Sequence, residues 1–269
     1  MITIGSIAIF LYAVAWAALA SQWRAKLRQS DAPRLSQHYL KLWAAAAVLH
    51  AVYLYTPLLH QQHLALDFFS AASHIMWLAG FILLISSLKQ NVESLILFTL
   101  PFVGLALALQ LVITRNDSAE LILNSGTGVH IFSALLAYSM LMIAALQAVI
   151  LAYQHKQLHN RQSNIFLQQL PPLQVIDSLL FRFIATGLAL LSIALITGFI
   201  YLENLFGQRV GHKTILSIIA WLVFSGLLIG RWRYGWRGLS AAKWTLSGFG
   251  LLMLAFFGTK FVQEYLLTP

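Results

Sequence analysis

The sequence predicts an all-α, polytopic membrane protein, a bundle of about eight transmembrane helices with both termini outside. Three observations support this fold class. Hydrophobic residues make up 59% of the 269 residues and charged residues only 9%, whereas soluble domains carry roughly 25% charged residues. The apolar residues are collected in eight stretches, each close to the ~20 residues that cross a hydrocarbon core about 30 Å thick. The loops between the stretches are short, and most of them are basic.

The eight spans follow one another along the whole chain. Met1 runs directly into Ile2 and Thr3, so the first span lacks the basic n-region and the small-residue cleavage site of a signal peptide. We therefore expect it to stay as a helix. Because no loop is long enough for a soluble domain, residues 1–269 are expected to form a single transmembrane domain. The expected spans are residues 2–22, 39–59, 65–88, 94–113, 129–153, 179–203, 214–231 and 245–266.

The distribution of Lys and Arg predicts how the spans are oriented. Thirteen of the 17 basic residues fall on one side of the membrane, and basic residues accumulate on the cytoplasmic side, which places both termini outside. The net charge of +9 is divided among separate membrane-proximal loops, where anionic membrane lipids balance it. No nucleic-acid partner is therefore expected. The 13 residues are Arg24, Lys26, Arg28, Arg34, Lys41, Lys89, Lys156, Arg161, Arg182, Arg231, Arg233, Arg237 and Lys243.

Missing residue types and motifs limit the chemistry of the chain. It contains no Cys, which excludes disulfides and thiolate metal sites. A metal ion would have to be held by His, Met, Tyr or a carboxylate, and His is the expected ligand. No nucleophile elbow, phosphate loop or dinucleotide fingerprint occurs. We therefore expect a protein that is not an enzyme and has no catalytic residues.

Two histidines fall near the middle of their spans, His50 in the second and His74 in the third. An unpaired polar group in hydrocarbon is unfavourable by several kcal/mol. Each imidazole must therefore hydrogen-bond to a neighbouring helix or bind a ligand, and both alternatives stay open. Asp67 lies one to two turns outward from His74 and is either its partner or part of the outer mouth of the bundle.

Two further histidines lie at the outer ends of their helices. His130 opens the fifth span, and His212 comes just before the seventh. If these spans are neighbours, the two imidazoles can serve one haem in two ways. Either both bind the haem iron, or one binds the iron and the other forms a hydrogen bond with a haem propionate. Lys213 and the positive helix ends would attract carboxylates. This pattern predicts an outward-facing haem pocket, and the alternative is a pair of ordinary interfacial histidines.

The inner ends of the later spans carry charged and aromatic residues. Asp177 and Arg182 are expected to pair with each other or with other interfacial groups. The segment 231–238 mixes Arg with Trp and Tyr, which is typical of an anchor at the lipid headgroups. Recognition of haem propionates that enter from the cytoplasm is the alternative interpretation of this segment.

Several short motifs from residue 129 onward follow one another in a specific order. They are Val129-His130-Ile131, Leu136-Ala137-Tyr138, Gly211-His212-Lys213-Thr214-Ile215-Leu216-Ser217, Ala220-Trp221-Leu222-Val223-Phe224, Gly235-Trp236-Arg237-Gly238, Gly248-Phe249 and Phe257-Gly258. Over spans two to eight the chain resembles the CcsA/CcmC-type cytochrome c assembly family, in particular its small YpjD-like branch.

The resemblance implies a function. It implies a protein of the bacterial cell inner (plasma) membrane that binds haem b and assists haem handling or transfer toward the periplasmic face. Haem, membrane lipids and cytochrome c assembly proteins are the implied partners. His130 matches the family's first external haem ligand and His50 its intramembrane ligand, so both are expected to bind the haem iron. Position in the spans adds His212, His74 and Lys213 as cofactor-binding residues.

The chain departs from the family pattern in three places. The Trp-rich external segment is reduced to residues 204–213, Ile229 stands where the family has a second intramembrane histidine, and the chain ends at Pro269 where the family has another external histidine. These differences favour haem binding, transport or an accessory role over synthase activity. A HemX-like membrane regulator of tetrapyrrole synthesis is one alternative. The other is a proton-coupled small-molecule carrier, for which the deep positions lack carboxylates.

Overall fold

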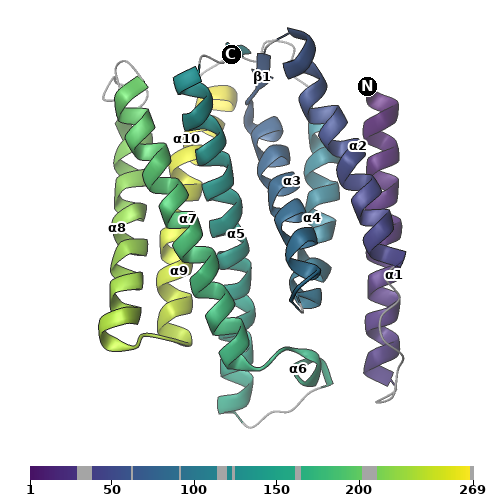
Figure 1. The fold of residues 1–269 in the computed structure, drawn as a ribbon, viewed down its shortest axis with the longest axis vertical. Coiled ribbons are helices and arrows are strands. Elements are labelled where there is room, and N and C mark those ends of the chain that lie inside the picture. Colours follow the sequence, from purple (N-terminus) through teal and green to yellow (C-terminus); the bar gives the residue numbers. More distant parts are fainter. Residues whose placement is uncertain are drawn as a thin grey trace. The chain divides into compact units, whose positions relative to one another are not determined.

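The computed structural model describes residues 1–28, 38–61, 63–90, 92–113, 120–122, 125–160, 165–201 and 211–266. The predicted all-α membrane fold is confirmed, because eight helices within these residues are long and apolar enough to cross a membrane. In chain order (Figure 1) the elements are α1 (Ile2–Arg28), α2 (His38–Gln61), β1 (His63–Ala65), α3 (Phe68–Ser87), α4 (Glu93–Val112), β2 (Glu120–Ile122), α5 (Ser125–His159), α6 (Ile165–Gln169), α7 (Leu173–Tyr201), α8 (Gly211–Tyr234), α9 (Leu239–Met253), the π-helical segment η1 (Leu254–Gly258), α10 (Thr259–Phe261) and the π-helical segment η2 (Val262–Leu266).

The chain forms two compact units. The first unit comprises Met1–Ile122 with Asn164–Leu170, and the second comprises Leu123–Ser163 with Pro171–Pro269. The first unit therefore contains α1 to α4, the two short strands and α6, and the second contains α5 and all helices from α7 onward.

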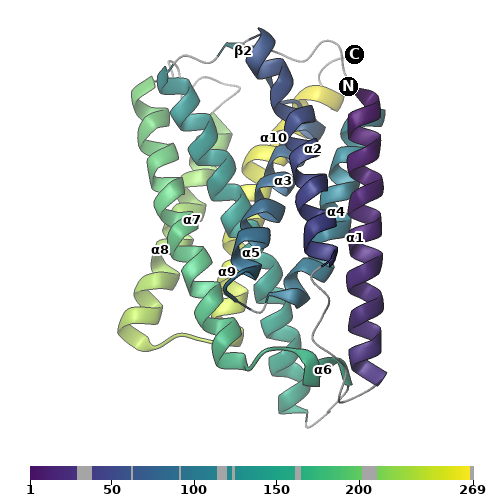
Figure 2. The same ribbon diagram turned by 45° about the vertical axis from the view of Figure 1, so that its right-hand side comes forward.

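In the first unit, α1 packs against α2 and α4, and α3 packs against α2 and α4. The strands β1 and β2 join the loops after α2 and α4 as a short antiparallel pair, with His63 opposite Ile122. The short helix α6 lies against α1 (Figure 2), where Phe166 packs on Trp23 with ring centroids 6.3 Å apart. The result is a four-helix group whose shared interior contains both deep histidines.

In the second unit, α5 and α7 form the most extensive helix pair, and α9 packs against both α5 and α8. Small residues permit this close packing. A Cβ atom on Gly187 of α7 would lie 2.7 Å from Cγ of Leu141, and one on Gly248 of α9 would lie 2.9 Å from the ring of Phe224. Because Gly lacks this atom, the helices approach each other closely without a clash.

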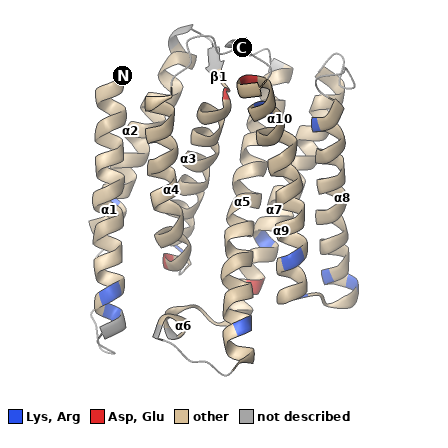
Figure 3. Cartoon of the chain, turned by 180° about the vertical axis from the view of Figure 1, so that it is seen from behind, with Lys and Arg blue, Asp and Glu red and all other residues tan. Residues whose placement is uncertain are grey.

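Charged residues lie toward the ends of the long helices, as Figure 3 shows. Large apolar side chains remain exposed along the helices, for example Phe10, Leu105 and Ile200. Helices that are apolar on all sides are typical of spans that face lipid. The placement of both termini outside stays a prediction.

Candidate functional site

The start of α5 in the second unit holds His130 in a defined orientation. The first turn of α5 runs close to the last turn of α7, because a Cβ atom on Gly126 would collide with the ring of Tyr201. This approach brings the half-buried His130 against α7, where its Nδ1 lies 2.7 Å from the carbonyl oxygen of Ala194. A carbonyl oxygen only accepts hydrogen bonds, so Nδ1 carries the proton and donates it. The second ring nitrogen, Nε2, then has its lone pair available.

This arrangement fits a ligand of haem iron. Histidine ligands typically donate their non-coordinating N–H to a backbone carbonyl or a carboxylate, which fixes the tautomer and the orientation of the ring. Ala194 provides such a carbonyl for His130. Among the described residues, no group forms a hydrogen bond with Nε2 of His130. The imidazole is therefore held by the protein through one nitrogen and presents the other.

His212 and Lys213 lie in the first turn of α8. Within the described helices, α5 and α8 each pack against α7 and α9 rather than mainly against each other. The shared pocket was expected only on the condition that the fifth and seventh spans are neighbours, and α5 and α8 are not an extensively packed pair. His212 is exposed, and no cluster of three or more His, Asp or Glu side chains suited to a metal ion occurs in the described parts of the chain. The role of His212 as a cofactor-binding residue stays a prediction.

His50 is completely buried in the first unit and has contacts at both ring nitrogens. Its Nδ1 lies 3.3 Å from the hydroxyl of Tyr12, and its Nε2 lies 3.0 Å from Oγ of Ser73. Tyr12 belongs to α1, His50 to α2 and Ser73 to α3. The imidazole therefore connects three helices, which is the hydrogen-bonded alternative expected for a deep histidine.

His74 is equally deep, but only one of its nitrogens has a partner. Nδ1 donates to the carbonyl oxygen of Ser70, one turn earlier on α3, at 2.7 Å. Nε2 is buried and has no hydrogen-bond partner among the described residues. The edge of the ring packs against Tyr55, with centroids 5.6 Å apart. A buried acceptor without a partner is unfavourable, so Nε2 of His74 is a second candidate for ligand binding.

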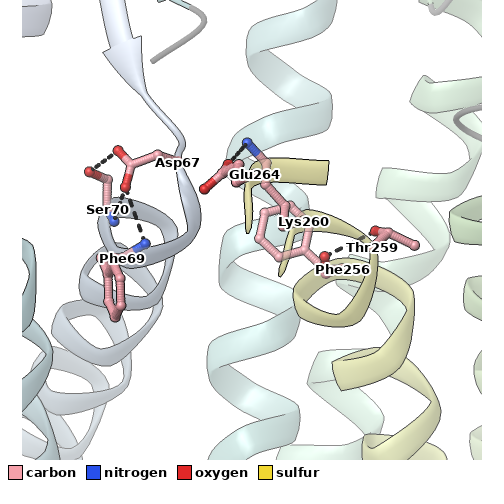
Figure 4. Close-up of polar contacts among 7 residues, drawn as sticks. All are labelled: Asp67, Phe69, Ser70, Phe256, Thr259, Lys260 and Glu264. Carbon is pink, nitrogen blue, oxygen red and sulfur yellow. Dashed lines mark hydrogen bonds and ion pairs between the residues drawn. The ribbon is translucent and has the colours of Figure 1, made fainter. Parts of the chain in front are cut away.

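Asp67 caps α3 and contacts His74 only indirectly. Its carboxylate accepts hydrogen bonds from the backbone N–H groups of Phe69 and Ser70, both at 3.1 Å, and from the hydroxyl of Ser70 (Figure 4). An Asp in this position satisfies the N–H groups that a helix leaves unpaired at its start. The side chain therefore orders the outer end of α3, and Ser70 stands between it and the imidazole of His74.

Where α7 begins and α8 ends in the second unit, Asp177 pairs with Arg231, 2.8 Å away, and not with the exposed Arg182. Asp177 also accepts a hydrogen bond from the backbone N–H of Gly238 at 3.1 Å. The guanidinium of Arg231 lies 4.5 Å from the ring centroid of Phe181. Arg231 is therefore held in place by the protein. The neighbouring exposed aromatic residues are Trp232 and Tyr234, which favours the headgroup-anchor interpretation of this segment.

Sequence reasoning missed three partners of the candidate site, namely Tyr12, Ser73 and the carbonyl group of Ala194. Tyr12 and Ser73 are polar residues in apolar spans, which is a weak signal for a contact between helices. The carbonyl of Ala194 gives no signal, since every residue has one. The four histidines are divided between the units, with His50 and His74 in the first and His130 and His212 in the second.

The chain matches known proteins over most of its length. A sequence profile described as "Cytochrome C assembly protein" matches residues 39–267. The chain is 40% identical over 139 residues to the inner membrane protein YpjD of Escherichia coli strain K12, which covers 52% of each protein. It is 25% identical over 160 residues to protein HemX of Brevibacillus brevis, covering 58% of this chain and 59% of HemX.

A third relative is the cytochrome c biogenesis protein CcsA of Synechococcus sp. strain JA-3-3Ab. It is 31% identical over 100 residues, covering 36% of this chain and 29% of CcsA. The chain thus spans about half the length of the first curated relatives it matches. No solved structure matches. All candidate site residues in α2 to α8 fall within the profile match, whereas α1 with Tyr12 precedes it.

Proposed function

Because this chain belongs to the cytochrome c assembly protein family, we propose that it is a haem-binding protein of the bacterial inner membrane. It assists haem handling or the transfer of haem toward the periplasmic face. Its relatives include an inner membrane protein and a cytochrome c biogenesis protein by name. The observation that carries the proposal is the geometry of His130, whose Nδ1 is fixed on Ala194 while Nε2 is left for iron.

His130 is the proposed external ligand of haem b. Bound haem supplies an iron that accepts a nitrogen lone pair, and the protein supplies an imidazole in the required tautomer. The hydrogen bond to Ala194 selects the tautomer with the proton on Nδ1 and holds the ring in one orientation, so little ordering is needed on binding. The protein acts by binding and orienting haem, with membrane lipids as its surroundings and cytochrome c assembly proteins as proposed partners, and no catalytic residue is assigned.

Within the first unit, His50 or His74 is proposed as an intramembrane haem ligand. The family resemblance favours His50, but iron binding there requires one nitrogen to leave Tyr12 or Ser73. His74 requires no such exchange, because its Nε2 is already without a partner among the described residues. The geometry thus favours His74, because it can bind iron without breaking an existing hydrogen bond.

A second candidate function is a HemX-like membrane regulator of tetrapyrrole synthesis. The similarity to HemX over 160 residues favours it. A regulator that acts through protein contacts alone does not need an iron ligand. This alternative therefore predicts a purified protein without a Soret band, whereas the first function predicts one.

An absorbance titration with haem tests the proposal. The detergent-purified protein is expected to develop a Soret band, and His130→Ala is expected to weaken haem binding by at least about tenfold, because even outer-shell partners of metal ligands contribute 10- to 100-fold to affinity. His159→Ala is the matched control, since His159 is an exposed residue at the opposite end of α5. A Soret band that is identical in both variants, or absent from the wild type, contradicts the proposal.

A further inference from the structure

A cluster of charged side chains lies at the end of the second unit where α8 begins and the chain's last helix ends. Lys260 of α10 pairs with Glu264 of η2 at 3.1 Å (Figure 4). Their side chains are only 21% and 19% exposed. Lys213 of α8 is half-buried, and its Nζ lies 5.9 Å from the ring centroid of Phe256, one turn before Lys260.

Within the described residues this cluster carries more positive than negative charge. Electrostatic interactions link Lys213 with both Lys260 and Glu264, so two ammonium groups share the surroundings of one carboxylate. Like charges in a partly desolvated place repel each other, and an aromatic ring compensates an ammonium group only in part. A further carboxylate group would relieve this repulsion and form charge-assisted hydrogen bonds with both lysines.

The cluster is connected to the helix that carries His130. Phe256 of η1 packs against Tyr138 of α5, with ring centroids 5.8 Å apart, and the hydroxyl of Tyr138 donates to the carbonyl oxygen of Leu252 at 2.8 Å. Tyr138 lies two turns along α5 from His130, which is about 12 Å at 1.5 Å per residue. Phe256 and Glu264 both lie in π-helical segments, and such segments are frequent at functional sites.

From this geometry we propose that Lys213 and Lys260 bind the propionate carboxylates of haem. Glu264 is the internal carboxylate that occupies Lys260 until a propionate replaces it. This inference rests on the proposed function, since it assigns residues to the carboxylate edge of a haem whose iron His130 binds. Lys260 and Glu264 are new members of the site, and both lie in the last described membrane-spanning stretch, Leu239–Leu266.

The test compares haem with its dimethyl ester, in which both carboxylates are esterified and uncharged. In the wild type, haem is expected to bind more tightly than the ester. The double variant Lys213→Gln/Lys260→Gln is expected to lower the affinity for haem by about tenfold or more, since a hydrogen bond to a charged group contributes at least about that factor. The affinity for the ester should stay unchanged, which also shows that the variant is folded. Partition of the ester into detergent is the same for every variant and cancels in the comparison.

Two further variants sharpen the result. Lys243→Gln removes an exposed lysine from α9 of the same unit and is expected to leave both affinities unchanged. Glu264→Gln removes the competing carboxylate and is expected to tighten haem binding without affecting the ester. If the double variant binds haem as tightly as the wild type while His130→Ala still loses it, the lysine site is wrong and the proposed function stands. If the wild type binds neither compound, both proposals are overturned.

Discussion

The two units use histidine in different ways. In the first unit, His50 is buried in the middle of the helices, with Tyr12 and Ser73 at its two ring nitrogens. In the second unit, His130 lies in the second turn of α5, held through one nitrogen by a carbonyl of α7. Burial alone therefore does not identify a ligand. The number of ring nitrogens already engaged distinguishes a histidine that connects helices from one that has a lone pair left for the proposed iron.

His74 shows that the burial of a histidine and the number of its engaged ring nitrogens are independent. It is as deeply buried as His50, yet like His130 it has one nitrogen fixed by a carbonyl and the other without a partner among the described residues. The comparison therefore ranks His130 and His74 above His50 as ligands, and substitutions that separate stability from haem binding test this ranking.

The largest expected effect on stability comes from His50→Ala. The substitution removes contacts among three helices, leaves two hydroxyl groups without their partner and opens a cavity, for which we expect a loss of about 2–4 kcal/mol in the free energy of unfolding. His130→Ala should lose about 1 kcal/mol or less, because it removes one hydrogen bond at a half-buried position. Unfolding by SDS in mixed micelles measures both values. The comparison fails if His50→Ala is as stable as the wild type but abolishes the Soret band.

The fold was predictable from the sequence because hydropathy is a local property. Each predicted span overlaps one of the eight long helices, and the main difference in length is the fifth, which extends over Gly126–His159 instead of 129–153. Helices do not have to end where the hydrocarbon ends, and the residues after 153 include good helix formers such as Lys156 and Gln157. The short pairing of β1 with β2 was missed, since three-residue strands leave almost no pattern.

The candidate site was predictable only in part, because it depends on contacts between distant helices. The residue types and their depth made His50, His74 and His130 candidates. Whether a ring nitrogen is free depends on Tyr12 in one case and on the carbonyl of Ala194 in another, and neither is visible in a local pattern. Hydropathy also contains no information on which helices pack together, so the sequence could not decide whether the spans that carry His130 and His212 are neighbours.

A smaller effect on the free energy of unfolding is expected from Gly187→Ala, which tests the helix packing of the second unit. The second unit depends on close approach of α5 and α7, and the new Cβ atom would lie 2.7 Å from Cγ of Leu141. Overpacking of this kind reduces the free energy of unfolding by about 1–3 kcal/mol. Gly226→Ala in α8 is the matched control, because no atom lies within 4 Å of its added Cβ. The same SDS titration should find the control unchanged or slightly stabilised, and equal losses in both variants would indicate a general effect of helix glycines.

The smallest expected effect comes from Tyr12→Phe, which removes one hydroxyl and keeps the ring whose centroid lies 5.8 Å from that of His50. The loss in the free energy of unfolding should be about 0.5–1.5 kcal/mol, since interhelical hydrogen bonds in membranes contribute modestly. The haem titration makes the result decisive. If His50 only connects helices, the variant binds haem like the wild type. If His50 binds iron, Tyr12 is the group that orients it, and loss of such a partner weakens binding by roughly tenfold or more. Since Tyr12 lies outside the family match at residues 39–267, that second outcome would make α1 part of the haem site.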